Sequence, residues 1–125
     1  MLDLIYSDED KISANGQRYE PHFKSDWNPD LFCEQSYICH LVVLRTALVR
    51  DVGGFRTGVE GAQDWDLLWR VMERSNPERV CHVPFILYHW RSIEGSTAQG
   101  TGAKPYVLEA QRPILNRRNN MKRVA

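Results

Sequence analysis

The chain has 125 residues, of which 42% are hydrophobic and 26% charged, so it has enough apolar material for the core of one ordinary domain. Its 16 basic and 16 acidic residues give a formal net charge of zero, and we therefore expect no nucleic-acid partner. Its apolar stretches are much shorter than the roughly 20 residues of a transmembrane helix, and no secretory-signal pattern is present, so we expect a cytoplasmic protein.

The first predicted element is a short strand over residues 2–6, which ends where an acidic cluster begins. Residues two apart in an extended segment share a face, so Asp8 and Asp10 are expected to present their carboxylates together while Glu9 points away. Such a pair suits Mg²⁺ or Mn²⁺, which completes its shell with phosphate oxygens and water. Taken alone, the same pair is more simply interpreted as an acidic turn that faces solvent.

Turn and capping signals follow the acidic cluster. Asn15 and Gly16 form a strong tight-turn dipeptide, which predicts a small hairpin whose second arm begins at residues 17–19. Asn28 is a good N-cap for a short helix over residues 29–33, because Asn accepts from free backbone N–H groups and proline is tolerated in the first turn.

The middle of the chain predicts a strand and then a helix. Residues 37–44 are apolar and rich in β-forming residues, which favours a strand. Residues 45–52 predict a short helix that Gly53 and Gly54 stop.

The clearest helix begins at Asp64 and ends before Asn76 and Pro77. Its apolar residues recur every three to four positions, and they are Trp65, Leu68, Trp69 and Met72. Asp64 and Asp66 lie in the first turn, where capping would explain one carboxylate. Asp64 also stands at the end of an exposed loop, where a general base could reach a substrate. Residue chemistry alone leaves these two interpretations equal.

A strand over residues 80–90 follows, and its alternation places His89 and Arg91 on one face. The pair offers a nitrogen ligand and a guanidinium suited to phosphate, although a histidine on a strand is more often packed in a core. Trp27 and Trp65 offer surfaces that stack on a sugar ring, although aromatic residues at such positions are usually core.

The last part of the chain predicts a small polar loop to residue 103 and a helix from Pro105 that Pro113 interrupts. The basic residues after it indicate a solvated tail, with contact to the inner membrane face as the minor interpretation. Cys33, Cys39 and Cys81 are interpreted as reduced thiols, and a zinc site that includes His40 is the weaker alternative.

Five motifs in register resemble the family-2 glycosyltransferases of the GT-A fold, across residues 2 to about 108. The motifs are YSDEDK at 6–11, FKSDWNPDL at 23–31, GGFR at 53–56, EGAQDWDL at 60–67, and LYHWR at 87–91 with GSTA at 95–98. The resemblance implies an enzyme that transfers a sugar, with inversion, from a nucleotide-sugar donor to an acceptor hydroxyl.

The resemblance also assigns the catalytic and metal-binding roles. It implies that Asp10 ligates a divalent cation, Mn²⁺ or Mg²⁺, and that Asp8 supports the metal or the nucleotide. Asp64 would be the base that deprotonates the acceptor, and His89 would be a further ligand of the metal or the diphosphate.

The remaining expected contacts belong to the two substrates. Asp8, Arg91 and Gly54 are the predicted donor-binding residues. Trp27 and Trp65 are predicted to contact a sugar or glycan acceptor.

The family's domain begins with a nucleotide-binding βαβ half, whereas this sequence begins at the acidic strand. We therefore expect a partial GT-A fold of the α/β class, a mixed sheet flanked by helices without that half. Residues 1–108 would form the metal and acceptor side, and 109–125 a basic helix or tail. Whether such a chain transfers sugar in isolation stays open. The alternative is a non-catalytic assembly module whose exposed strand edges pair with another copy.

Overall fold

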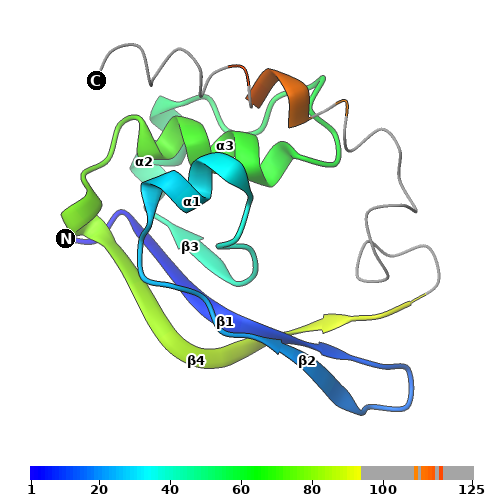
Figure 1. Cartoon of the computed structure of the whole chain (residues 1–125). Helices are drawn as coiled ribbons and strands as arrows, with labels where there is room; N and C mark the ends of the chain where they lie inside the picture. Colours follow the sequence, from blue (N-terminus) through cyan, green and yellow to red (C-terminus); the bar gives the residue numbers. More distant parts are fainter. Residues whose placement is uncertain (94–108, 110, 115, 117–125) are drawn as a thin grey trace.

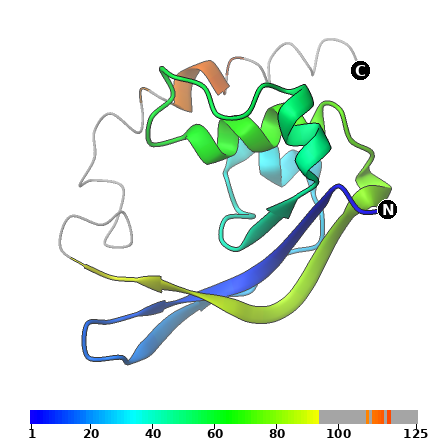
Figure 2. The same cartoon turned by 180° about the vertical axis from the view of Figure 1, so that it is seen from behind.

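One mixed sheet of four strands carries three helices on a single face (Figures 1 and 2). The computed structural model describes residues 1–93, 109, 111–114 and 116. The α/β class and the mixed sheet predicted from the sequence are confirmed.

Every strand pairing in the described sheet is made with β1 (Leu4–Ile12). The strand β4 (Val80–Arg91) runs parallel to β1 along its whole length. The strands β3 (Val42–Leu44) and β2 (Arg18–His22) are both antiparallel to β1, β3 against its first residues and β2 against its last. The first strand is therefore the centre of the sheet.

The prediction that the first strand ends before the acidic cluster is wrong. β1 continues through Asp8, Glu9 and Asp10, all of which are buried. Acidic residues are uncommon inside strands, so composition favoured an earlier end. The strand continues because β2 and β4 supply backbone partners on both of its edges.

The predicted hairpin turn and the first helix cap are confirmed. Gly16 has a φ of +83°, a left-handed conformation that suits glycine, and it lies in the turn between β1 and β2. Asn28 caps α1 (Pro29–Glu34), because its side-chain oxygen accepts from the backbone N–H of Leu31 at 3.0 Å.

The strand predicted over residues 37–44 is reduced to β3. Tyr37 and Ile38 are buried in the main core and pair with no strand in the described residues. β3 pairs with β1 only as far as Tyr6, and β2 takes up pairing from Glu9, so little of that edge of β1 is left for residues 37–41. The apolar pattern of these residues therefore indicated that they are buried, but it did not indicate whether they pair with a strand.

The two later helices form as predicted. α2 (Thr46–Asp51) ends before Gly53 and Gly54, both with positive φ. α3 (Gln63–Met72) turns its apolar face to the sheet and is followed by a 3₁₀ turn, Pro77–Arg79. The main core joins the two layers through Leu4, Tyr6, Phe32, Tyr37, Ile38, Trp65, Leu68, Trp69 and Ile114.

A buried charge cluster ties α3 to the loop after α2. Asp66 is 0% exposed and pairs with Arg70 at 2.9 Å and with Arg56. Arg70 also donates to the carbonyls of Val52 and Gly54, each at 2.7 Å. Asp66 therefore neutralises a nearly buried guanidinium that fastens this loop to the helix.

The C-terminal predictions lie mostly outside the described residues. This applies to the GSTA motif at 95–98, to the helix start at Pro105, and to most of the basic tail. Residues 111–114 are helical, and Ile114 packs in the main core. Within the part of the chain that the structure describes, no helix has the length and apolar character needed to span a bilayer.

Candidate functional site

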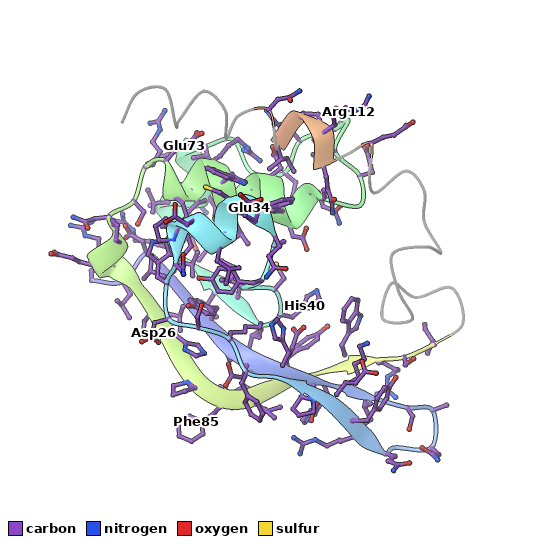
Figure 3. The ribbon with its side chains drawn as sticks, viewed as in Figure 1. Asp26, Glu34, His40, Glu73, Phe85 and Arg112 are labelled. Carbon is purple, nitrogen blue, oxygen red and sulfur yellow. The ribbon has the colours of Figure 1, made fainter. Side chains whose placement is uncertain are left out.

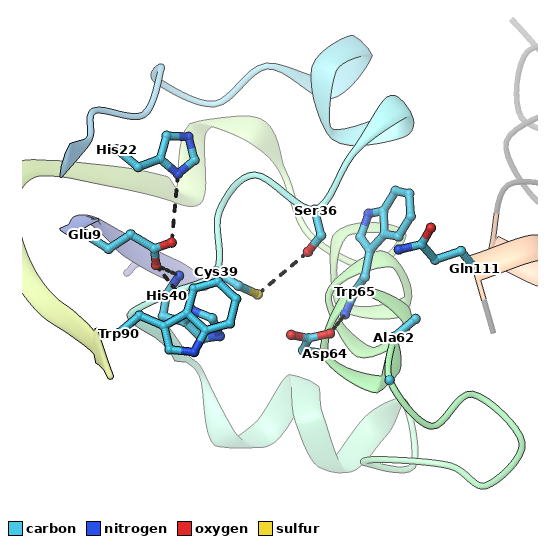
Figure 4. Close-up of a pocket in the computed structure, with 11 residues that line it drawn as sticks. Glu9, His22, Ser36, Cys39, His40, Ala62, Asp64, Trp65, Trp90 and Gln111 are labelled. Carbon is cyan, nitrogen blue, oxygen red and sulfur yellow. Dashed lines mark hydrogen bonds and ion pairs between the residues drawn. The ribbon is translucent and has the colours of Figure 1, made fainter. Parts of the chain in front are cut away.

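A cavity of about 270 Å³ opens between the acidic strand and the start of α3 (Figure 4). Its lining is polar and aromatic, and it comprises Glu9, His22, Ser36, Cys39, His40, Gly61, Ala62, Asp64, Trp65, Trp90 and Gln111. Two carboxylates, from β1 and from α3, therefore face one cavity.

Asp64 is the second residue of α3 and is partly buried. Its Oδ1 atom accepts from the backbone N–H of Trp65 at 2.8 Å, at the helix end where a negative charge is favoured. The sulfur of Cys39 accepts from Ser36 Oγ at 3.7 Å, and burial together with the charge of Asp64 raises the Cys39 pKa to about 12. Cys39 is therefore a neutral thiol at neutral pH.

Glu9, which alternation predicted to point away from the site, lines the cavity. Strict alternation from Leu4 and Tyr6, both in the core, would turn Asp8 and Asp10 toward the helices and not Glu9. Pairing between β1 and β4 is irregular on both sides of Asp8, and this irregularity interrupts the alternation. Pro84 is a sequence signal of this irregular pairing, since proline within a strand often marks a bulge.

Glu9 is held by cationic and N–H groups. Its Oε2 accepts from the backbone N–H of His40, lies 3.2 Å from His40 Nδ1, and lies 3.6 Å from Lys24 Nζ. Burial raises the Glu9 pKa, but the bonds from His40 and the Lys24 charge outweigh it, so that pKa is below its ordinary value. Burial in turn lowers the pKa of Lys24.

We predict that Glu9 makes the protein sensitive to acid. Its folded pKa is depressed, so its contribution to stability is complete above the ordinary value of 4.5 and is lost as pH falls through the folded value. Urea unfolding at pH 7 and pH 3 should show a smaller loss in Glu9→Gln than in the parent chain. Equal losses in the two proteins would contradict the prediction.

Asp10 and His89, two of the three predicted metal ligands, lie in direct contact. His89 Nδ1 bonds to Asp10 Oδ1, and Arg18 Nε donates to Asp10 Oδ2 at 2.6 Å. Burial raises the Asp10 pKa, but these two partners outweigh it and hold the pKa below its ordinary value. Asp10 is therefore an ionised carboxylate at neutral pH.

Asp8, the third predicted metal ligand, has different partners. Its Oδ1 lies 2.8 Å from His82 Nε2 and accepts from the backbone N–H of Lys24 at 2.9 Å. The other ring nitrogen of His82 lies 3.0 Å from Asp26. No group of three or more His, Cys, Asp or Glu side chains within the described ranges is gathered as a metal site.

The other predicted donor contacts are dispersed. Arg91 is exposed at the end of β4, and Gly54 lies beyond α2 with its carbonyl bonded to Arg70. Neither residue lines the cavity that contains Asp64.

The two predicted acceptor tryptophans lie in different cavities. Trp65 lines the cavity of Asp64, but its ring is buried and its Nε1 donates to the carbonyl of Phe32 at 3.2 Å. Trp27 packs on Phe32, with ring centroids 5.2 Å apart, and lines a separate apolar cavity of about 200 Å³.

The three cysteines do not converge on a zinc site. Cys33 lines the apolar cavity, Cys39 lines the polar one, and Cys81 lies on β4. None of the three forms a disulfide, and none belongs to a metal-binding group within the described residues.

The chain is similar to two longer bacterial proteins and matches no protein-family model. It is 51% identical, over 112 residues, to the uncharacterized protein y4gI of Sinorhizobium fredii. It is 42% identical, over 100 residues, to the O-antigen biosynthesis protein RfbC of Myxococcus xanthus. These matches cover 90% and 80% of the chain, but only 12% and 8% of the length of the relatives.

Proposed function

We propose that this chain is the metal- and acceptor-side part of a glycosyltransferase that moves a sugar from a nucleoside diphosphate to an acceptor hydroxyl with inversion. The observation that carries the proposal is the cavity between Asp64 and the acidic strand, which gathers carboxylates, histidines and aromatic rings. The similarity to a protein named for O-antigen biosynthesis supports it. The resemblance to enzymes that use nucleotide sugars favours a cytoplasmic reaction.

Asp64 is the proposed general base. Its carboxylate lies in the first turn of α3 and faces a cavity large enough for a sugar ring. Asp64 would take the proton of the acceptor hydroxyl as that oxygen attacks the anomeric carbon. Its carboxylic acid then returns the proton to solvent.

Asp10 and His89 are the proposed metal ligands, with Asp8 as a support of the metal or nucleotide. A carboxylate oxygen and an imidazole nitrogen form a donor set that suits Mn²⁺, and Arg18, which donates to Asp10 Oδ2, is half-exposed. A bound Mn²⁺ or Mg²⁺ would neutralise the charge that develops on the departing diphosphate.

Calorimetry with Mn²⁺ and a panel of nucleoside diphosphates tests this proposal. We expect metal-dependent binding of at least one diphosphate, and we expect Asp10→Asn to weaken it about tenfold or more, because a neutral amide is a poorer ligand for a hard cation. Glu20→Gln is a control that removes an exposed carboxylate from the neighbouring strand. Diphosphate binding that is absent, or that is independent of Mn²⁺, would contradict the proposal.

A non-catalytic assembly module is the second candidate. Two large apolar side chains of β4, Phe85 and Leu87, are exposed, and Phe85 points away from the helices (Figure 3). Exposed apolar surface of this kind favours association with another copy or partner. Concentration-dependent dimerisation without any diphosphate binding would favour this candidate.

A further inference from the structure

The proposed roles leave His40, on the cavity wall opposite Asp64, without a function. His40 comes from the segment between α1 and β3, and its side chain is one-third exposed. It lies between the sheet and the helical layer (Figure 3) and lines the cavity beside Glu9 and Trp90 (Figure 4).

The carboxylate of Glu9 fixes the orientation of the His40 ring. One oxygen of Glu9 lies 3.2 Å from His40 Nδ1 and also accepts from the His40 backbone N–H. In the neutral ring, a proton on Nδ1 that is donated to Glu9 leaves Nε2 as an acceptor. Within the described part of the chain, no hydrogen bond occupies Nε2.

Two aromatic rings of β4 support the imidazole from its sides. Tyr88 stacks on it, with centroids 4.9 Å apart and an interplanar angle of 23°, and the Trp90 centroid lies 5.0 Å away. The ring is therefore held by packing as well as by Glu9, which is the arrangement expected of a group that must keep one direction.

We propose that His40, oriented by Glu9, binds a second hydroxyl of a sugar acceptor whose reacting hydroxyl faces Asp64. Two acceptors on facing walls of one small cavity, with Trp90 beside them, suit a ring that carries several hydroxyl groups. The inference rests on the proposed transferase function and assigns His40 and Glu9 to the binding of its sugar acceptor. His40 is a specificity-determining residue in this scheme, and Glu9 is a positioning residue.

Nuclear magnetic resonance of the four imidazole side chains tests the inference directly. The probes are methyl glycosides of glucose, galactose, mannose and N-acetylglucosamine, added to the ¹⁵N-labelled chain. We expect at least one glycoside to shift the Nε2 resonance of His40 saturably, and to shift His82 and His89 much less. Absence of any saturable shift at His40 would overturn the inference.

Two variants separate hydrogen bonding from packing. His40→Phe keeps a planar ring beside Tyr88 and Trp90 but has no acceptor, so it should weaken glycoside binding roughly three- to tenfold. His40→Gln restores an acceptor and should recover part of the affinity. Unchanged glycoside affinity in a folded His40→Phe protein would overturn the inference.

The Mn²⁺ and diphosphate titration on the same samples distinguishes this inference from the proposed function. We expect the affinity for diphosphate in the presence of Mn²⁺ to be the same in His40→Phe as in the parent chain. If no diphosphate binds but glycosides still bind through His40, the transferase proposal fails and a sugar site remains. If diphosphates bind and glycosides do not, the transferase proposal stands and the role of His40 is refuted.

Discussion

Replacement of Asp64 by asparagine is expected to slow sugar transfer by about 10²- to 10⁴-fold, the usual contribution of a general base. Asparagine has nearly the same shape and still accepts from the backbone N–H of Trp65, but it takes no proton from a hydroxyl. Release of nucleoside diphosphate from the donor, in the presence of acceptor, measures the rate.

Binding of the diphosphate with Mn²⁺ should be retained in Asp64→Asn, because Asp10 and His89 lie outside the cavity lining that contains Asp64. Unfolding in urea should also change by less than about 1 kcal/mol, the usual size of a helix-dipole interaction. A variant that keeps near-normal turnover would refute the assignment of Asp64 as the base.

The change of aspartate to asparagine at position 66 is expected to lower the stability of the fold. Asp66→Asn should lower the free energy of unfolding by about 3–5 kcal/mol, because it leaves a nearly buried guanidinium without its counter-charge. Arg70 is only 10% exposed and lies between Asp66 and the carbonyls of Val52 and Gly54. This loss would be a large fraction of the stability of an ordinary domain.

Urea unfolding followed by tryptophan fluorescence measures the effect, since Trp65 and Trp69 flank Asp66 in the core. Asp64→Asn is the matched control, with the same chemical change on the same helix. Equal free energies of unfolding in the two variants would show that the ion pair of Asp66 with Arg70 does not stabilise the fold as expected.

Local signals predicted most of the fold. The Asn15–Gly16 turn, the Asn28 cap and the periodic apolar face of α3 each depend on a few neighbouring residues, and all three were confirmed. The extent of β1 and β3 depends instead on which distant segment offers hydrogen bonds. Composition within a strand does not contain that information.

The site was harder to predict than the fold. The contact between Asp10 and His89 follows from parallel pairing of β1 with β4, and the resemblance had paired the two residues as ligands. Glu9 was missed as a cavity residue because an irregular strand pairing, invisible in the apolar pattern, turns it toward the cavity, and His40 was considered only as part of the weaker zinc alternative. The proposed functions of all four residues stay predictions.

The position of β1 at the centre of the sheet matters while the chain is being synthesised. The acidic strand is made before the segment that carries its histidine partners, because His82 and His89, which partner Asp8 and Asp10, belong to the last described strand. Such non-local pairing is slow to form. Asp8 and Asp10 therefore lack these histidine partners until β4 has been made, and their charge disfavours association of this edge of β1 with other chains before β4 pairs with it.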